Sequence, residues 1–305
     1  MIDLREYLEI IKKERPQFFK SSFERAYSAF VKLGFHEKDK KYFIDNASDI
    51  VNQMRDRCWR DFLQEEQAFT SHMLKKLIIP RVIRNMTSEE ALFWYLEAYP
   101  EHIYQLCLSN TQSRRSRAGK EFEDIIELIL IGAGVPMDSQ GNIGIDRFEQ
   151  KGLGKLVDIV SPGVVEYELN KRNTILVSAK TTLRERWQEV PEEMGRTGAR
   201  EMFLATLDDK ISASVLRTLY EANIQIVTTK DIKQSRYLQN NSVLTFEQLI
   251  QISLDNYKQW ERYSFTDDQI LQVVDIMKRQ IEKHNTHDFI VSILSERLAS
   301  YTRTR

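Results

Sequence analysis

The chain has 305 residues, of which 42% are hydrophobic and 29% are charged, and its formal net charge is −1 at pH 7. This length allows one elaborated domain or two, and this composition is typical of soluble globular proteins. The near-zero net charge excludes a globally basic nucleic-acid-binding protein, so any contact with nucleic acid has to use local patches.

Cysteine usage and hydropathy indicate the compartment. The two cysteines, Cys58 and Cys107, lie far apart and have no metal-binding spacing, which fits a reducing environment. No apolar run approaches the roughly 18 residues that a membrane span needs. The first residues, Met1-Ile-Asp-Leu-Arg-Glu6, are too charged for a signal peptide. We therefore expect a soluble, cytoplasmic protein without membrane contact.

The first part of the chain, residues 1–110, has almost no glycine and a helical periodicity. Apolar residues recur at spacings of three and four at Val51, Met54, Cys58 and Phe62, which predicts a helix with one buried face. Trp59 continues this stripe, so the pattern by itself favours a tryptophan in the core.

The middle part, residues 111–235, holds most of the glycines and all the clear strand patterns. We predict strands at Leu156–Val160, Thr174–Lys180, Met202–Thr206 and Ile224–Val227, and helices at Ser116–Ile131 and Ile211–Ala222. Strands separated by helices of this length predict an α/β fold in which helices cover both faces of the sheet. The glycine-rich segment Val135–Gly154 is predicted to be a connecting loop.

The last part, residues 236–305, is helical again. Thr245-Phe-Glu-Gln248 and Thr266-Asp-Asp-Gln269 each match a capping box in front of an amphipathic run. The helices beyond Phe265 serve either as a dimer surface or as a cover for the core, and the sequence favours neither. His284 and His287 have no third ligand nearby, which predicts surface histidines rather than a zinc site.

Two of the predicted strands carry a charged side chain. Asp158 lies inside the apolar run Leu156–Val160, and Lys180 ends the next strand. An acid and a lysine so placed can hold a divalent metal beside an attacking water, as phosphodiester hydrolysis requires. A bare carboxylate in a buried strand is costly unless it binds a metal or a partner. A purely structural ion pair between Asp158 and Lys180 explains these two residues equally well.

A third acid follows the lysine strand, and the candidates are Glu192 and Glu193. If this segment is helical, its apolar residues share one face, namely Trp187, Val190 and Met194. Glu193 then leans toward that face and Glu192 toward solvent. Pro191 should kink this helix or begin a new one. We expect Glu193 to be the functional acid.

The triplet Arg184-Glu185-Arg186 lies between the lysine and this acid. An arginine fork matches O6 and N7 of guanine, and a glutamate can accept from N4 of cytosine in the major groove. A two-fold dimer presents the triplet twice and so reads CC on one side and GG on the other. The alternative is a solvated helix start of mixed charge, the usual meaning of such a run.

Asp158, the run Ser178-Ala-Lys180 and Glu193 resemble the PD-(D/E)XK nucleases in a variant form. In that variant the acid two residues before the lysine is replaced, here by Ser178, and a downstream helix glutamate substitutes for it. Val157 stands where the name of the family has proline. The run from Lys180 to Trp187 closely resembles type II restriction endonucleases of the group of SsoII, PspGI and the EcoRII catalytic domain.

This resemblance covers about residues 116–230 and implies a fold and a reaction. The implied fold is a restriction-endonuclease-like α/β core, with a central mixed sheet flanked by helices and helical additions at both ends. The implied enzyme is a Mg²⁺-dependent homodimer that cuts double-stranded DNA at CC/GG palindromes such as CCNGG and leaves 5′-phosphates. A modification methyltransferase is its implied genetic partner.

The resemblance also assigns roles to catalytic residues. It implies that Asp158 and Glu193 are metal ligands, with the Ala179 carbonyl as a third candidate, and that Lys180 orients or deprotonates the attacking water. Glu123 matches a helix glutamate that often supports the metal site, and its alternative is a solvated helix residue.

Further residues are candidates for DNA contact. Arg114, Arg115 and Arg117 are either phosphate contacts or solvated arginines. Arg55 and Trp59 lie four apart in one predicted helix and so share a face. Relatives in the resembled group extrude the central nucleotides of their site, and an indole with a guanidinium plane could sandwich an extruded base.

Two other functions stay open on the sequence. A structure-directed repair or junction nuclease could share the catalytic core, but it would not need residues 184–186 for base choice. A non-catalytic DNA-binding regulator would bind specifically and never cut with Mg²⁺. The restriction endonuclease is the function that we predict.

Overall fold

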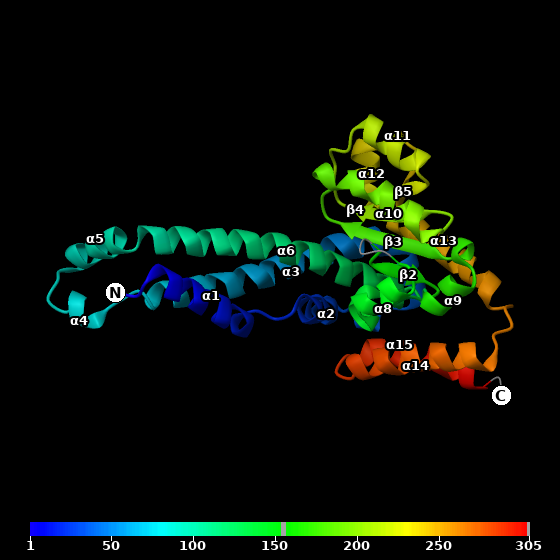
Figure 1. Ribbon diagram of the computed structural model, residues 1–305, viewed down its shortest axis with the longest axis horizontal. Coiled ribbons are helices and arrows are strands. Elements are labelled where there is room, and N and C mark those ends of the chain that lie inside the picture. Colours follow the sequence, from blue (N-terminus) through cyan, green and yellow to red (C-terminus); the bar gives the residue numbers. More distant parts are fainter. Residues whose placement is uncertain (154–156, 304–305) are drawn as a thin grey trace. The chain divides into compact units, whose positions relative to one another are not determined.

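The structure is a computed structural model that describes residues 1–153 and 157–303 (Figure 1). It consists of two compact units, of which unit 1 comprises Met1–Ala26 and Asp56–Glu121 and unit 2 comprises Tyr27–Arg55 and Phe122–Arg305. The sequence predicted a separate N-terminal region over residues 1–110. In the structure, residues 27–55 of that region belong instead to the unit that contains the sheet. No helix in the described ranges is long and apolar enough to cross a membrane.

Unit 1 is built from helices alone. It contains α1 (Leu4–Phe18), α4 (Pro80–Ile83), α5 (Ser88–Ala98) and parts of α2 (Ser22–Lys32), α3 (Lys40–Lys75) and α6 (Pro100–Gly132). Within this unit α3 and α6 run side by side (Figure 1) and are joined by polar contacts such as Asn110 to Thr70. Phe62, Phe69 and Met73 of α3 form the core with Tyr7 of α1, so the predicted buried face of this helix is confirmed.

Unit 2 contains a mixed sheet with six strands in its described residues, in the order β1 to β6. The strands are β1 (Asp138–Ser139), β2 (Ile159–Ser161), β3 (Ile175–Lys180), β4 (Met202–Thr206), β5 (Ile224–Thr228) and β6 (Val243–Thr245). The pairs from β1 to β3 are antiparallel and those from β3 to β6 are parallel. The four predicted strands are present, although Leu156 lies outside the described residues and Asp158 immediately precedes β2.

The sequence missed β1 and β6 because two or three residues are too short for a strand pattern. The segment Val135–Gly154 is likewise wrong as a connecting loop, since it contains β1 and two short helices. These are α7 (Gln140–Ile143) and α8 (Ile145–Gln150), each too short to show a helical period.

Helices cover both faces of the sheet, as predicted. The remaining helices of unit 2 are α9 (Val164–Leu169), α10 (Glu189–Thr197), α11 (Ala213–Glu221), α12 (Lys230–Arg236), α13 (Phe246–Trp260), α14 (Asp267–Lys283) and α15 (Asp288–Arg303). One face of the sheet, including Leu176 and Leu204, packs in a core with Met194 of α10 and Leu219 of α11. Val177 and Phe203 alternate to the opposite face and are also buried.

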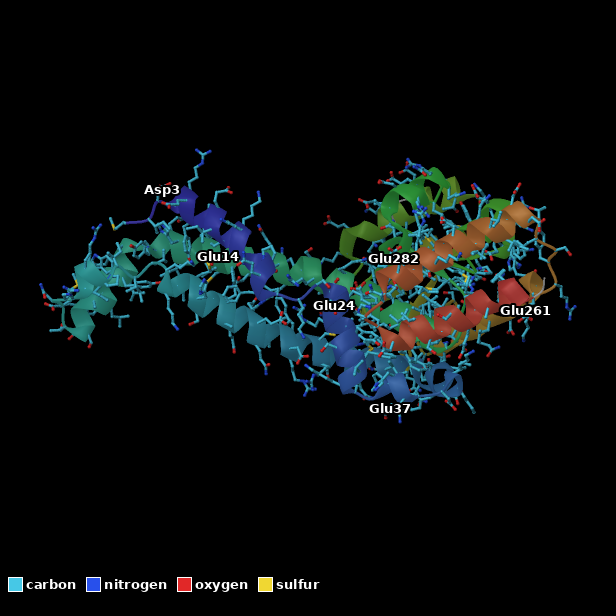
Figure 2. All side chains as sticks on the ribbon, turned by 90° about the horizontal axis from the view of Figure 1, so that it is seen from below. Asp3, Glu14, Glu24, Glu37, Glu261 and Glu282 are labelled. Carbon is cyan, nitrogen blue, oxygen red and sulfur yellow. The ribbon has the colours of Figure 1, made fainter. Side chains whose placement is uncertain are left out.

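The C-terminal helices α14 and α15 lie side by side (Figures 1 and 2). Both predicted capping boxes are confirmed, at Thr245 with Gln248 and at Thr266 with Gln269. Ile276 and Met277 of α14 enter the core that packs on the sheet. These helices therefore cover the core, which was one of the two alternatives left open by the sequence.

His284 and His287 are buried, so their prediction as surface residues is wrong. Their Nδ1 atoms lie 3.2 Å apart, and Nε2 of His284 lies 2.7 Å from Oδ1 of Asn142. Asn142 in turn donates to Glu127 over 2.7 Å. The two rings are enclosed because each finds a polar partner, which periodicity cannot reveal.

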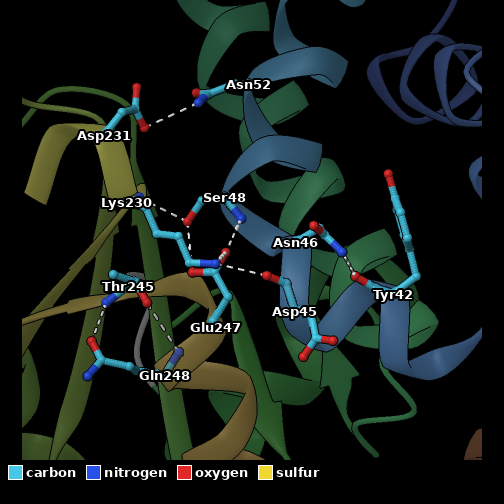
Figure 3. A network of polar contacts seen from close by, with 10 residues as sticks. All are labelled: Tyr42, Asp45, Asn46, Ser48, Asn52, Lys230, Asp231, Thr245, Glu247 and Gln248. Carbon is cyan, nitrogen blue, oxygen red and sulfur yellow. Dashed lines mark hydrogen bonds and ion pairs between the residues drawn. The ribbon is translucent and has the colours of Figure 1, made fainter. Parts of the chain in front are cut away.

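The N-terminal half of α3 is attached to α12 and α13 by the polar network of Figure 3. The helix is interrupted at Asn46, where the backbone leaves helical geometry. Just beyond this kink, the backbone N–H and the hydroxyl of Ser48 each donate to a carboxylate oxygen of Glu247 over 2.8 Å. Lys230 donates to the Asp45 carbonyl over 2.8 Å. Glu247 thus acts as a tertiary cap that orients the second segment of α3.

The first prediction concerns the buried histidines. Burial, with His287 and Lys283 nearby, lowers the pKa of His284 to about 3. The unfolded ring titrates near pH 6.5, so the unfolded state binds more protons between these values. The stability that neutral His284 contributes is therefore present above about pH 6.5 and is lost as the pH falls toward 3. We expect the free energy of unfolding to drop by about 2 kcal/mol between about pH 7.5 and about pH 5 from this group.

Urea titrations of wild type and His284→Phe at both pH values measure this effect. The variant should be less stable at neutral pH, because Asn142 and His287 lose a partner, and its pH dependence should be smaller. His36→Phe at an exposed site is the control and should keep the wild-type difference. An unchanged pH dependence in His284→Phe would contradict the prediction.

Candidate active site

The start of β2 and the end of β3 bring Asp158, Ala179 and Lys180 together. Asp158 immediately precedes β2, and its backbone N–H donates to the Val177 carbonyl of β3 over 2.9 Å, which places Asp158 beside the last residues of β3. The Ala179 N–H donates to Oδ2 of Asp158 over 2.7 Å, and Nζ of Lys180 lies 3.4 Å from the same oxygen. The ammonium also donates to the Ala179 carbonyl over 3.0 Å.

The Asp158 carboxylate is buried, and its ionised form is disfavoured in spite of the neighbouring Lys180 ammonium. This side chain is 6% exposed, and burial raises its pKa to about 6. Lys180 lowers the pKa and Glu123 raises it, so α6 places Glu123 close enough to act on Asp158. The ion pair considered from the sequence is present, but it does not offset the burial. A carboxylate perturbed in this way is typical of active sites.

Ser178 occupies the position where the resembled nucleases usually have an acid. Its side chain is fully buried, and among the described residues its hydroxyl has no hydrogen-bond partner. The neighbouring strand places Leu204 beside it. The position is therefore part of an apolar wall and supplies no charged ligand.

The helix α10 has the orientation predicted for the third acid. Val190, Met194 and Thr197 are its buried residues. Glu193 is half-buried, whereas Glu192 is exposed and forms an ion pair with Arg196. Pro191 lies in the first turn of α10, which begins after a separate 3-10 turn, so the proline marks a new helix. The assignment of Glu193 as a metal ligand stays a prediction.

The donors at this site are carboxylate and carbonyl oxygens. In the described part of the chain, no cluster of three or more His, Cys, Asp or Glu side chains forms a metal centre. Magnesium needs only one or two carboxylates, because waters and substrate phosphate supply its other ligands. The buried Asp158 carboxylate beside the Ala179 carbonyl fits such an ion better than zinc, which prefers nitrogen and sulfur.

The triplet Arg184-Glu185-Arg186 lies in the 3-10 turn η3 (Arg184–Gln188) and not at the start of an α-helix. Arg184 and Glu185 are exposed, and the side chain of Arg186 lies outside what the structure describes. Arg184 has a φ of 43°, in the left-handed region that residues other than glycine rarely adopt. Leu183 just before it is buried. The charged residues are thus presented on a turn that is anchored at its first end.

Of the three α6 arginines, two are held by protein groups of unit 1. Nε of Arg114 donates to the buried carboxylate of Glu66 over 3.0 and 2.9 Å. Arg117 donates to the Lys20 carbonyl over 2.9 Å. Arg115 is exposed. The prediction of a phosphate contact is therefore best supported for Arg115.

Trp59 is 46% exposed, so the core tryptophan favoured by the pattern is not found. Its indole stacks on Phe62 with ring centroids 5.8 Å apart, and the guanidinium of Arg114 lies 5.7 Å from its centroid. Arg55, in unit 2, is exposed. Trp59 lies at the edge of the apolar stripe of α3. The spacing of apolar residues alone cannot distinguish such an edge position from the buried positions of the stripe.

Sequence reasoning missed Asp208, which follows β4. One carboxylate oxygen of Asp208 accepts from the Leu183 N–H over 2.9 Å, next to the charged triplet. The available signal was an acid two residues after the end of the parallel strand that neighbours the Lys180 strand.

Comparisons with known proteins identify the family of this chain. A family model described as EcoRII C terminal matches residues 96–250. The type II restriction enzyme SsoII of Shigella sonnei is 48% identical over 295 residues, which are 97% of this chain and 97% of that protein.

Two solved structures are also similar to this chain. Metal-depleted Ecl18kI in complex with uncleaved DNA has a TM-score of 0.91 and 47% identity, and the match covers 98% of this chain and 100% of that chain. The complex of the restriction endonuclease PspGI with substrate DNA has a TM-score of 0.58 and 15% identity, covering 85% and 98%, and shows likeness of fold.

Proposed function

This chain belongs to the type II restriction endonucleases of the SsoII and EcoRII C-terminal group, and we propose that it cuts DNA at CC/GG palindromes such as CCNGG. It acts with Mg²⁺ as a homodimer, leaves 5′-phosphate ends, and has a cognate modification methyltransferase as its genetic partner. Sequence similarity to the restriction enzyme SsoII along 97% of the chain favours this function over a repair nuclease or a DNA-binding regulator. The observation that carries the proposal is the buried Asp158 carboxylate beside Lys180.

The catalytic proposal assigns one task to each residue at this site. Asp158, Glu193 and the Ala179 carbonyl hold Mg²⁺, and Glu123 supports them from α6. When bound, the ion neutralises charge that develops on the phosphate and makes a coordinated water more acidic. Lys180 orients or deprotonates the attacking water, and the Asp158 and Ala179 oxygens that it contacts at 3.4 and 3.0 Å fix the place of its ammonium.

The specificity proposal rests on the turn that follows the catalytic strand. Arg184 and Glu185 are exposed only a few residues after Lys180, as a base-reading segment must be. With Arg186, they read two adjacent G·C pairs through the major groove. A two-fold dimer repeats this reading on the other half of the site, as a palindrome requires.

The proposal for the central base rests on Arg55 and Trp59. Extrusion of the central nucleotides lets one dimer accept any central base, because every base offers a face for stacking. An exposed indole is available for such stacking, and a core tryptophan would not be.

The second prediction concerns catalysis. Asp158→Ala, Lys180→Ala and Glu193→Ala should each lower the cleavage rate by on the order of 10²–10⁴-fold, since each removes a group from the reacting centre. Specific DNA binding should survive, because the reading residues are intact. Plasmid digestion with Mg²⁺ and mapping of the ends measure cleavage, and circular dichroism checks the fold. Glu192→Ala, at the exposed neighbouring site, is the control and should stay active. An essential Glu192 with a dispensable Glu193 would reverse the assignment of the helix faces.

The third prediction concerns base readout. Arg184→Ala or Arg186→Ala should cost about 1–3 kcal/mol of discrimination for each arginine–guanine contact. Because a dimer makes each contact twice, specific binding should fall steeply. Methylation of the outer cytosine should block cleavage, since an added methyl crowds Glu185 in the groove. Competition binding at one fixed salt concentration measures this. Unchanged site preference in Arg184→Ala, Glu185→Ala and Arg186→Ala would disprove the readout.

The fourth prediction concerns the central base. A 2-aminopurine at this position should brighten when the protein binds, because extrusion unstacks it, unless Trp59 quenches it by stacking. Trp59→Ala should then give a brighter signal than wild type and weaker binding. Trp94→Ala, outside the reading residues, is the control. No fluorescence change with either wild type or Trp59→Ala would rule out the stacking role.

A further inference from the structure

The loops after β3 and β4 meet at Asp208. The two strands are parallel neighbours, and Lys180 at the end of β3 is the register partner of Thr206 at the end of β4. One carboxylate oxygen of Asp208 accepts from the Leu183 N–H over 2.9 Å, and the other accepts from the Lys210 N–H over 3.0 Å. A single side chain thus joins the loop that bears the charged triplet to the loop after β4.

The loop that carries Asp208 is itself fixed on buried groups. The Asp208 N–H donates to the hydroxyl of Thr206 over 3.2 Å. The hydroxyl of Tyr237 donates to the Asp208 carbonyl over 2.9 Å and accepts from the Ile211 N–H over 3.0 Å. Thr206 and Tyr237 are both buried, so the Asp208 carboxylate is held by a rigid base.

The group that Asp208 holds is next to a strained residue. Arg184 has a φ of 43°, and an arginine keeps such a conformation only where its surroundings fix it. On its N-terminal side, the buried Leu183 side chain and the Leu183 N–H that donates to Asp208 provide this support. The direction in which Arg184 leaves the backbone therefore depends on Asp208.

We propose that Asp208 is a positioning residue for base readout. It acts through the Leu183 backbone and the left-handed turn at Arg184, and it sets the approach of Arg184 and Glu185 to the bases. This inference rests on the proposed function, in which that segment reads DNA. A carboxylate suits the task because both of its oxygens accept from N–H groups, whereas an asparagine has only one accepting oxygen.

The test measures kcat and KM of Asp208→Ala on a cognate duplex and on a duplex with one outer G·C pair replaced. Loss of a hydrogen bond to a charged group should raise KM for the cognate duplex by about 10–100-fold, with kcat changed only a few-fold at saturating DNA. The ratio of kcat/KM between cognate and altered duplex should fall by a similar factor. Asp208→Asn should lie between wild type and Asp208→Ala.

Asp209→Ala is the matched control, because its side chain makes an exposed ion pair with Arg236 at 3.4 Å. This variant should keep the wild-type kcat, the wild-type KM and the wild-type ratio of kcat/KM between the cognate and the altered duplex. Thermal melting checks the fold of every variant. If Asp208→Ala does not fold, Tyr237→Phe removes one hydroxyl from the base of the loop and should shift KM and the ratio in the same direction, by less.

Two outcomes overturn the inference. One is a folded Asp208→Ala variant in which the ratio of kcat/KM between cognate and altered duplex is unchanged. The other is a loss of kcat on both duplexes with the same ratio as wild type, which would indicate general damage to the site. The readout itself is tested separately by Arg184→Ala and Glu185→Ala. If those variants change site preference and Asp208→Ala does not, only the role of Asp208 fails. If they change nothing, the proposed readout fails instead.

Discussion

The Asp158 carboxylate is buried just before the start of β2, and the arrangement of the site depends on how the neighbouring groups compensate the cost of burying this charge. An ionised carboxylate in such a place is unfavourable unless cations and N–H donors surround it. The antiparallel pairing of β2 with β3 supplies the Ala179 N–H and the Lys180 ammonium. These two groups do not fully compensate the desolvation of the Asp158 carboxylate, because its pKa is still raised to about 6. The proposed divalent cation would satisfy the remaining demand for positive charge at this carboxylate.

The same argument explains why Ser178 can replace an acid. A carboxylate at position 178 would lie beside Leu204 in an apolar wall, where desolvation disfavours its ionised form. Glu193, the proposed second acid, lies on α10 and is half-buried. The desolvation cost of a second acid is thereby smaller.

The parts of the fold that the sequence predicted are those with long repeating patterns. β3, β4 and β5 are continuous apolar runs, and Glu193 was separated from Glu192 by helical periodicity. Elements as short as β1 and α7 contain less than one period and were missed. The burial of His284 depends on Asn142, far away in the chain, and no local pattern records such a partner. The exposure of Trp59 could not be predicted either, because it depends on which parts of the chain pack against this side of the helix.

In the proposed function, the segment that reads the bases begins only a few residues after the catalytic lysine. Three residues separate Lys180 from Arg184, and this stretch is tied at its end by Leu183 to Asp208. Its two ends are held separately, because Asp208 holds the Leu183 N–H whereas Asp158 and the Ala179 carbonyl hold the Lys180 ammonium. The Leu183 N–H donates to Asp208 in the loop after β4, whereas Lys180 belongs to β3. The charged triplet is therefore held from the end of a different strand than the lysine. Loss of the Asp208 contact would therefore displace the proposed reading residues and leave the Lys180 ammonium beside Asp158, so that binding and discrimination change more than the chemical step.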